Sequence, residues 1–387
     1  MDKRQRIDEE VKRHKHIIVC GDNINSLNIV RCLGEKGITP MAIIAGDDWL
    51  RKVAKSRYIG RVIYVRNYAE ALTELLKYAD TSCPPFVYST DDTQLQLLDA
   101  NYDLLKGKFF FFNAGEQGRL TRFLSKQEQN KLAEECGLRV PKYEEVARGE
   151  LPRTLQYPVI TKTYNSYSKG WKIDVTICYS PEELQEAYQH MVSERLLLQE
   201  YVEKVTEYDM QGICINGGES VYMPFETTFL RYTKDSFGGY MDFKPFKNKE
   251  IQDKLQRMFK AIGFSGCFEV EFLVDKNKEL HFLEINLRFS AYNYGTNVGG
   301  FSLPYEWAKA TLLGRIEIDK TTLRNDRYLY MNEMYDANFA KEVGYGKWIW
   351  QLLSADGYIY YNKKDIWPLL SRYIQKAQHK IKKMVRK

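Results

Sequence analysis

The sequence predicts a mixed α/β and α+β protein with a doubly wound N-terminal α/β domain, a small α+β lid and a C-terminal antiparallel-sheet domain. Strand and helix patterns alternate over residues 16–115, and a proline-bearing linker and capped helices follow over residues 120–200. A strongly alternating hairpin then lies at residues 269–288. A chain of 387 residues is also too long for one ordinary core.

Residues 1–120 are predicted to form the N-terminal α/β domain. Strands are expected at 16–20, 39–45, 59–65 and 86–89, with helices at 26–36 and 69–78. This order of strands and helices is typical of βαβ units in a parallel sheet. The turn at Gly21 lacks the Gly-x-Gly-x-x-Gly pattern, so no dinucleotide is expected there.

Residues 121–204 are predicted to form the lid. Ser125 and Glu128 have the spacing of a capping box for a helix that would reach Cys136. Further strands are expected at 159–163, 171–178 and 196–202, and a helix should begin after Ser180.

Residues 205–320 are predicted to form the C-terminal antiparallel sheet with helices at 249–261 and 304–314. Residues 321–387 are predicted to be a helical extension with a basic tail. Trp348, Trp350 and Trp367 lie in this extension, and we expect them to pack in the interior rather than form a stacking surface.

Composition excludes several classes of protein. Hydrophobic residues make up 44% and charged residues 28%, as in soluble globular proteins. No apolar run approaches the roughly 18 residues of a membrane span, and the charged segment 1–15 does not resemble a signal peptide. Seven dispersed cysteines predict reduced thiols and a cytoplasmic location. Nucleic-acid binding has no supporting motif.

Basic residues concentrate in the tail, residues 376–387, although the net charge of the whole chain is only +6. Together with Ile374, Ile381 and Met384, the tail fits a basic amphipathic helix lying on anionic lipid. A solvated terminal helix is the alternative. Peripheral contact with a membrane is therefore left open, and the sequence does not specify the oligomeric state.

The hairpin at 269–288 carries the strongest functional signal. Glu271 lies within the first apolar strand, and Glu284 and Asn286 share one face of the second. Carboxylates in apolar strands are costly to bury unless they are paired or bound to metal. Two carboxylates and an amide oxygen suit Mg²⁺, with Glu269 as a substitute ligand. A solvated hairpin face is the alternative.

The motif Glu…Glu-Ile-Asn-Leu-Arg, preceded by Gly263 and Gly266, resembles the metal-binding end of the ATP-grasp ligases. The resemblance extends over about residues 16–315 and is greatest to carboxylate–amine ligases such as the D-aspartate ligases of Gram-positive cell-wall synthesis. It implies an ATP-grasp fold and an ATP-dependent ligase that forms an amide bond through an acyl-phosphate. It also implies ATP and Mg²⁺ as cofactors, with Mn²⁺ able to substitute, and ADP and phosphate as products.

Two lysines match the phosphate-binding lysines of this family. Lys126 begins the lid helix, where Arg122 and Lys131 are competing candidates, and Lys162 ends a lid strand. The loop 165–170 stands where the family has a glycine-rich loop over the phosphates. Because its only glycine is Gly170, the resemblance implies that Ser168 and Lys169 replace some backbone donors.

The nucleoside is expected at the hinge between lid and sheet. The resemblance places adenine against Glu200 and the backbone up to Val202, and ribose against Glu207, with Asp209 as the competing candidate. Glu271, Glu284 and Asn286 would then hold Mg²⁺ between the phosphates.

Two arginines are the predicted catalytic residues. Arg288 shares a strand face with Asn286 and would clamp the transferred phosphoryl group or the acyl oxygen. Arg231, with Lys234 as second choice, would bind the carboxylate of a small-molecule substrate, and residues 289–293 would line the side of the amine substrate.

Other functions stay open at this stage. One alternative is an ATP-grasp tailoring enzyme of cell-surface polysaccharide synthesis, and another is a nucleotide-binding module without ligase activity. A nicotinamide-dependent dehydrogenase is disfavoured, because the glycine fingerprint is missing.

Overall fold

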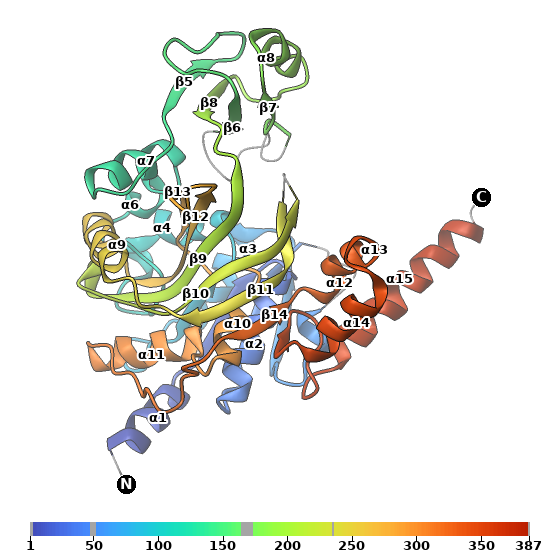
Figure 1. The fold of residues 1–387 in the computed structure, drawn as a ribbon. Helices are drawn as coiled ribbons and strands as arrows, with labels where there is room; N and C mark the ends of the chain where they lie inside the picture. Colours follow the sequence, from blue (N-terminus) through green and yellow to red (C-terminus); the bar gives the residue numbers. More distant parts are fainter. Residues whose placement is uncertain (1–2, 47–51, 164–172, 234–235, 386–387) are drawn as a thin grey trace.

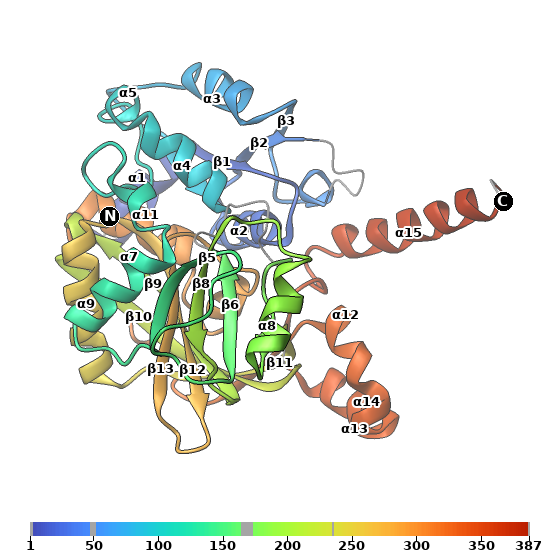
Figure 2. The ribbon, with the colours of Figure 1, turned by 90° about the horizontal axis from the view of Figure 1, so that it is seen from above.

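A computed structural model describes residues 3–46, 52–163, 173–233 and 236–385 (Figure 1). The chain forms a four-stranded parallel sheet, a four-stranded antiparallel sheet and a seven-stranded mixed sheet. Figures 1 and 2 together place the small antiparallel sheet above one end of the large sheet. The mixed α/β architecture predicted from the sequence is therefore confirmed.

The N-terminal sheet has the strand order β3-β2-β1-β4, and all its pairs are parallel. Its strands are β1 His16–Cys20, β2 Met41–Ala45, β3 Arg61–Val65 and β4 Phe86–Ser89. The accompanying helices are α1 Lys3–Arg13, α2 Ile24–Glu35, the 3₁₀ turn η1 Val53–Lys55, α3 Tyr68–Leu76, α4 Asp92–Ala100, α5 Tyr102–Leu105 and α6 Arg119–Arg122.

Alternate residues of β1 face two different cores. Ile18 and Cys20 pack with α2 in the largest core, which continues into the seven-stranded sheet. Ile17 and Val19 pack with α3 on the other side. Helices therefore cover both faces of this sheet, as in a doubly wound fold.

The lid sheet has the order β5-β8-β6-β7 and a core of its own. Its elements are β5 Tyr143–Ala147, β6 Val159–Thr163, β7 Ile177–Cys178, α8 Pro181–Tyr188 and β8 Arg195–Glu200, and helix α7 Lys126–Glu135 precedes them.

Two local predictions for the lid are wrong. Ser125 precedes α7 but makes no capping hydrogen bond with its side chain, and Glu128 pairs with Arg122, so neither half of the expected capping box is formed. The strand expected at 171–178 is reduced in its described part to β7, the last two residues.

The large sheet has the order β13-β12-β9-β10-β11-β14-β15. Its strands are β9 Lys204–Ile215, β10 Ser220–Thr233, β11 Ser236–Pro245, β12 Gly266–Asp275, β13 Leu280–Asn286, β14 Tyr328–Met331 and β15 Gly357–Tyr358. The connecting helices are the 3₁₀ turn η2 Asn216–Gly218, α9 Lys249–Ile262, α10 Asn293–Val298 and α11 Leu303–Leu313. The predicted hairpin is present as β12 and β13, paired in antiparallel register.

The C-terminal segment contributes β14 and β15 to the large sheet as well as several helices. These helices are α12 Glu333–Asp336, the 3₁₀ turn η3 Ala337–Phe339, α13 Ala340–Val343, α14 Tyr345–Ser354 and α15 Trp367–Val385. Within the described residues, no helix has the length and apolar character needed to cross a bilayer.

The expectation that the tryptophans of this segment pack in the interior is wrong for two of them. Trp350 is 67% exposed and Trp367 is 61% exposed. Trp348 is partly buried, and its Nε1 donates a hydrogen bond of 2.8 Å to Asp336. The inward side of α14 thus makes polar contacts, and apolar side chains are left on its outward side.

A buried ion pair fastens the C-terminal segment to the N-terminal domain. Arg31 on α2 donates to Asp365 at 3.0 Å, and both side chains are fully buried. The same guanidinium donates to the carbonyls of Ile359 and Tyr360, and Asp365 accepts from Ser56 at 2.9 Å. Residues more than 300 positions apart are therefore held together by one satisfied network.

Replacing Asp365 with alanine should therefore destabilise the protein strongly. Arg31 would be left as an unpaired buried charge, which costs about 3–5 kcal/mol of the free energy of unfolding. Urea unfolding of the full chain measures this quantity. Asp326→Ala, which removes an exposed partner of Arg324, is the matched control and should change it little. Equal effects of the two substitutions would contradict the structural role of the pair.

Candidate functional site

A row of acidic and amide side chains crosses three adjacent strands of the large sheet. Glu271 on β12 lies in register with Asp209 on one side and Glu284 on the other. Glu269 lies between Gln211 and Asn286 in the same way. Because alternate residues of a strand share a face, the side chains of this row project from one face of the sheet. We call these residues the acidic row: Glu207, Asp209, Gln211, Glu269, Glu271, Glu284 and Asn286.

The structure brings the three predicted metal ligands together. The Nδ2 atom of Asn286 lies 2.6 Å from Oε1 of Glu271 and 3.4 Å from Oε1 of Glu284. It also lies 3.2 Å from Glu269, the predicted substitute ligand. Glu269, Glu271 and Asn286 are buried, so a freely solvated hairpin face is not what the structure contains.

Burial and mutual repulsion make the carboxylates of this row costly to ionise. Burial and the charge of Glu284 raise the pKa of Glu271 well above its usual value. Burial, followed by Glu269 and Glu207, has the same effect on the pKa of Asp209. Within the described residues, one oxygen each of Glu207, Asp209 and Glu269 is buried without a hydrogen-bond partner. A cation placed in the row would relieve both penalties.

Two lysines approach the row from the lid side. Lys126, the first residue of α7, forms an ion pair with Glu284. Burial alone would raise the pKa of Glu284, but the charge and hydrogen bond of Lys126 lower it to about 2. Lys162, at the end of β6, donates to Gln199 at 2.6 Å. Burial and the charge of Lys126 lower the pKa of Lys162 to about 7.

The other candidates for the first phosphate lysine lie differently. Arg122 is exposed and pairs with Glu128, and Lys131 is exposed on α7. Among the described residues, Lys126 contacts the acidic row, whereas Lys131 and Arg122 do not. Ser168, Lys169 and the rest of the loop 164–172 lie outside the described residues, so their predicted role stays a prediction.

The predicted nucleoside residues lie where the chain passes from the lid to the large sheet. Glu200 ends β8 and is exposed, and Val202 lies between β8 and β9. Glu207 is buried and pairs with Lys204. Asp209, its competitor, is fully buried and accepts a hydrogen bond from Tyr292. Glu207 lies nearer the start of β9, next to the hinge, and its predicted contact with ribose stays a prediction.

Arg288 lies between the acidic row and the N-terminal domain. It follows β13 and forms an ion pair of 3.2 Å with Asp92, the first residue of α4. The Nδ2 atom of Asn25 donates to the carbonyls of Thr90 and Phe289, at 3.2 Å each, and so joins the same two segments. Arg288 therefore faces the carboxyl ends of β1 and β4, where parallel sheets bind ligands at the change of strand order.

Sequence reasoning missed Asp92 as a member of the site and placed Tyr292 only in the segment 289–293, which was expected to line the side of the amine substrate. Asp92 follows the N-cap residue Asp91 and is the first residue of α4, the element directly after β4. Its position at the carboxyl end of a parallel strand is the signal that could have identified it. The hydrogen bond from Tyr292 to Asp209 could not have been predicted, because it joins residues 83 positions apart.

Arg231 is placed away from the acidic row, against the C-terminal segment. Its guanidinium makes two hydrogen bonds with Asp336, at 2.8 and 2.5 Å, and a third with Gln351 at 2.8 Å. It also lies 4.4 Å from the centre of the Tyr240 ring. A contact with substrate would require this arrangement to open, so its catalytic role stays a prediction. Lys234, the second choice, lies outside the described residues.

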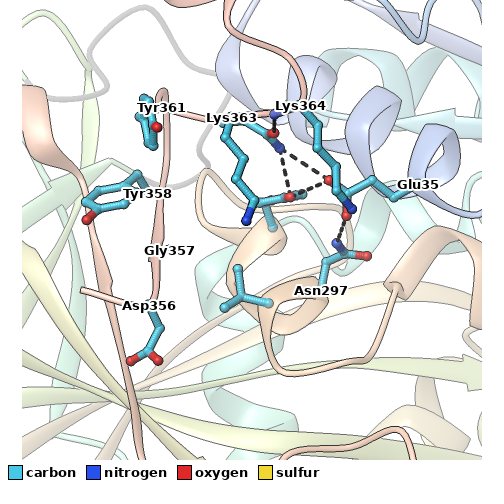
Figure 3. Close-up of a pocket in the computed structure, with 11 residues that line it drawn as sticks. Glu35, Asn297, Asp356, Gly357, Tyr358, Tyr361, Lys363 and Lys364 are labelled. Atoms are coloured by element: carbon cyan, nitrogen blue, oxygen red, sulfur yellow. Dashed lines mark hydrogen bonds between the residues drawn. The ribbon is translucent and has the colours of Figure 1, made fainter. Parts of the chain in front are cut away.

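A cavity of about 470 Å³ lies between α2, α10 and residues 356–364 and shares no residue with the acidic row (Figure 3). Glu35 accepts hydrogen bonds from Tyr294 at 2.6 Å and from Asn297 at 2.9 Å. Asn362 donates to Tyr294 at 2.8 Å. The polar groups on this wall of the cavity therefore satisfy one another.

The opposite pKa shifts of Glu271 and Glu284 predict that replacing each with glutamine changes the free energy of unfolding of the metal-free protein in opposite directions. The pKa of Glu271 is higher in the folded protein than in the unfolded chain, so the folded protein loses stability as the pH rises above the unfolded-state pKa. Glu271→Gln removes this loss and should stabilise the protein by about 1 kcal/mol or more near pH 8. The lowered pKa of Glu284 contributes stability above the unfolded-state pKa, so Glu284→Gln should destabilise by about 1–3 kcal/mol.

Urea unfolding in EDTA at pH 8 and near pH 3 measures both effects. The stabilisation by Glu271→Gln should vanish near pH 3, where the Glu271 carboxyl is protonated in the folded and the unfolded state. The destabilisation by Glu284→Gln should shrink near pH 3, because the Glu284 carboxylate loses its stabilising effect as the pH falls toward its pKa of about 2. Effects of the same sign at pH 8 would contradict the electrostatic account of the row.

Known proteins share this domain and this fold. Residues 125–312 match the family model described as the carbamoyl-phosphate synthase L chain, ATP binding domain. The N5-carboxyaminoimidazole ribonucleotide synthase of Staphylococcus epidermidis is 25% identical over 237 residues, which are 59% of this chain and 59% of that protein. The propionyl-CoA carboxylase alpha chain of Ruegeria pomeroyi is 21% identical over 205 residues, 48% of this chain and 29% of that protein. The matches thus span less than two thirds of these curated relatives.

The similarity to solved structures extends over more of the chain than the sequence matches do. The N5-carboxyaminoimidazole synthetase of Staphylococcus aureus complexed with ADP has a TM-score of 0.65 at 14% identity, covering 85% of both chains. The L-amino acid ligase of Bacillus licheniformis has a TM-score of 0.60 at 13% identity, covering 82% of this chain and 79% of that one. The match to an ATP-binding domain and the shared fold both agree with the resemblance to ATP-grasp ligases that the hairpin motif indicated.

Proposed function

We propose that the protein is an ATP-dependent ligase that joins a carboxylate to an amine through an acyl-phosphate. The observation that carries this proposal is the acidic row on β9, β12 and β13, with Lys126 and Lys162 facing it from the lid. A nucleoside triphosphate that is held for phosphoryl transfer requires oxygen ligands for its metal ion and cationic side chains for its phosphates. The row and the two lysines offer both.

The side chains of the row fit Mg²⁺. Glu271, Glu284 and Asn286 offer only oxygen ligands, which Mg²⁺ prefers, and Mn²⁺ takes the same ligands. The partnerless buried oxygens of Asp209 and Glu269 support a cation in the row. When bound there, the ion would neutralise the negative charge that builds up on the phosphates.

Three cationic side chains have distinct tasks in this proposal. Lys162, whose amine is held by Gln199 rather than by a carboxylate, would bind phosphate oxygens and become fully protonated there. Lys126 would exchange its ion pair with Glu284 for the phosphates when the metal takes that carboxylate. Arg288 would hold the carboxylate substrate in line with the γ-phosphate through its planar fork.

The reaction transfers the γ-phosphoryl group from ATP to an oxygen of the carboxylate substrate and releases ADP. The amine then attacks the acyl carbon, loses a proton and displaces inorganic phosphate. The acceptor amine would lie between Arg288 and the carboxyl ends of β1 and β4, where Asn25, Thr90 and Asp92 meet the segment after β13. Water must be excluded while the acyl-phosphate exists.

We propose an amino acid as one substrate, which the likeness to an L-amino acid ligase supports. D-Aspartate and a peptidoglycan precursor are the specific pair that the sequence resemblance implies. A tailoring reaction on a cell-surface polysaccharide is the second candidate, and it uses the same acyl-phosphate chemistry with a different acceptor. The free thiols of all seven cysteines support a cytoplasmic location, and we propose that the basic tail meets the membrane surface.

The direct test is to incubate the protein with Mg-ATP, hydroxylamine and pools of D- and L-amino acids, and to measure phosphate and hydroxamate. Hydroxylamine intercepts an acyl-phosphate, so one pool should yield hydroxamate together with an equal amount of phosphate. Glu284→Ala should lower both by about 100-fold or more, because the metal loses a ligand.

Glu279→Ala is the matched control, because Glu279 lies at the exposed tip of the same hairpin and pairs with Arg139. It should leave the rate unchanged. Phosphate release that survives Glu284→Ala would overturn the proposed metal site. Mg-ATP binding without phosphate release in any pool would instead support a nucleotide-binding module.

A further inference from the structure

Helix α14 turns its apolar side chains outward. Tyr345, Ile349, Trp350 and Leu353 are all exposed, and Leu353 reaches 77% exposure. The opposite side of the helix is occupied by polar contacts, in which Trp348 binds Asp336 and Gln351 binds Arg231. The helix is therefore fixed to the body in an orientation that keeps a large apolar surface in water, which soluble monomers rarely retain without a use.

Helix α15 has an outward apolar side as well. Trp367, Leu370 and Ile374 follow helical spacing on one face, and Tyr373 flanks them; all four are exposed. The inner side packs on the body through Pro368, which is buried, and Arg372, which lies 4.3 Å from the centre of the Tyr360 ring. Figures 1 and 2 both show α15 extending away from the body at the end of the molecule that carries α14.

The charged residues of α15 and the two residues after it are all basic. Residues 367–387 contain seven lysines and arginines and no acidic residue, so they account for the whole positive net charge of the chain. Helix α14 contains one lysine and no acidic residue. Aromatic residues beside basic residues are typical of helices that lie in the interface of a membrane with anionic lipid.

We propose that the outward faces of α14 and α15 form one docking surface for an anionic lipid bilayer, with Trp350, Leu353 and Trp367 entering the headgroup region. This inference deepens the proposed membrane contact of the basic tail by adding a folded apolar surface to it. A second copy of the chain fits the surface less well, because pairing these helices would bring two uniformly basic segments together.

The surface is also connected to the large sheet. Asp336 accepts hydrogen bonds from both Arg231 on β10 and Trp348 on α14. Docking would therefore orient the large sheet, and with it the acidic row, at a fixed height relative to the bilayer.

Flotation of the full-length protein with vesicles tests this inference. Vesicles of phosphatidylcholine with about one-third phosphatidylglycerol should bind the protein, pure phosphatidylcholine vesicles should bind it at least about tenfold less, and about 0.5 M NaCl should weaken binding. The double substitution Trp350→Glu with Leu353→Glu should lower binding to the anionic vesicles at least about tenfold.

The double substitution Leu151→Glu with Val192→Glu, which places the same two charges at exposed apolar residues of the lid, is the matched control and should bind as the unsubstituted protein does. Without vesicles, the Trp350/Leu353 variant should form hydroxamate at the normal rate. Glu284→Ala should still float with anionic vesicles. The two assays therefore distinguish a failure of the ligase proposal from a failure of the membrane proposal. No binding to anionic vesicles, unaltered binding of the Trp350/Leu353 variant, or a dimer in light scattering that the Trp350/Leu353 substitutions dissociate would overturn the inference.

Discussion

Repulsion among buried carboxylates on β9, β12 and β13 is the constraint on which the rest of the site depends. The strand register puts Asp209, Glu271 and Glu284 side by side, and burial, followed by the like charges of neighbouring carboxylates, raises the pKa of Asp209 and of Glu271. Lys126 relieves this repulsion at Glu284. The remaining cost falls on Glu271 and Asp209, and it explains why such an arrangement suits a bound cation better than a merely structural role.

The other parts of the molecule hold cationic groups against this row. Lys126 begins a lid helix, Lys162 ends a lid strand, and Arg288 follows the strand that carries Glu284. The N-terminal domain supports Arg288 through Asp92, and the C-terminal segment closes back on that domain through Arg31 and Asp365. Elements from both ends of the chain therefore stabilise a site whose ligands lie in the middle of the sequence.

The short-range patterns in the sequence predicted the hairpin, the three oxygen-bearing side chains that share its face and most strands of the first domain, because residue alternation and spacing decide them locally. The site residues that depend on long-range register were not predictable in this way. The bond between Tyr292 and Asp209 and the burial of Arg231 against Asp336 require the order of the strands, which no local pattern contains. The exposed tryptophans Trp350 and Trp367 were assigned to the interior for the same reason: the sequence does not reveal which side of a helix meets the body.

The ATP-grasp fold is shared by proteins with different substrates, so fold alone does not select the reaction. What narrows it here is the chemistry of the described side chains: oxygen ligands, two lysines and an arginine, without a pairing of nucleophile and base in the row. In the proposed reaction such a set would position and neutralise phosphates and would leave bond formation to the substrates themselves.

The central claim is that one divalent ion is held by Glu271, Glu284 and Asn286 beside the phosphates of ATP. Crystals grown with Mn²⁺ and a non-hydrolysable ATP analogue test it most directly, because anomalous scattering locates the manganese. We predict a manganese peak in direct contact with oxygens of all three side chains and of the analogue's phosphates. A peak outside the acidic row, or carboxylates of Glu271 and Glu284 turned away from the bound analogue, would contradict it.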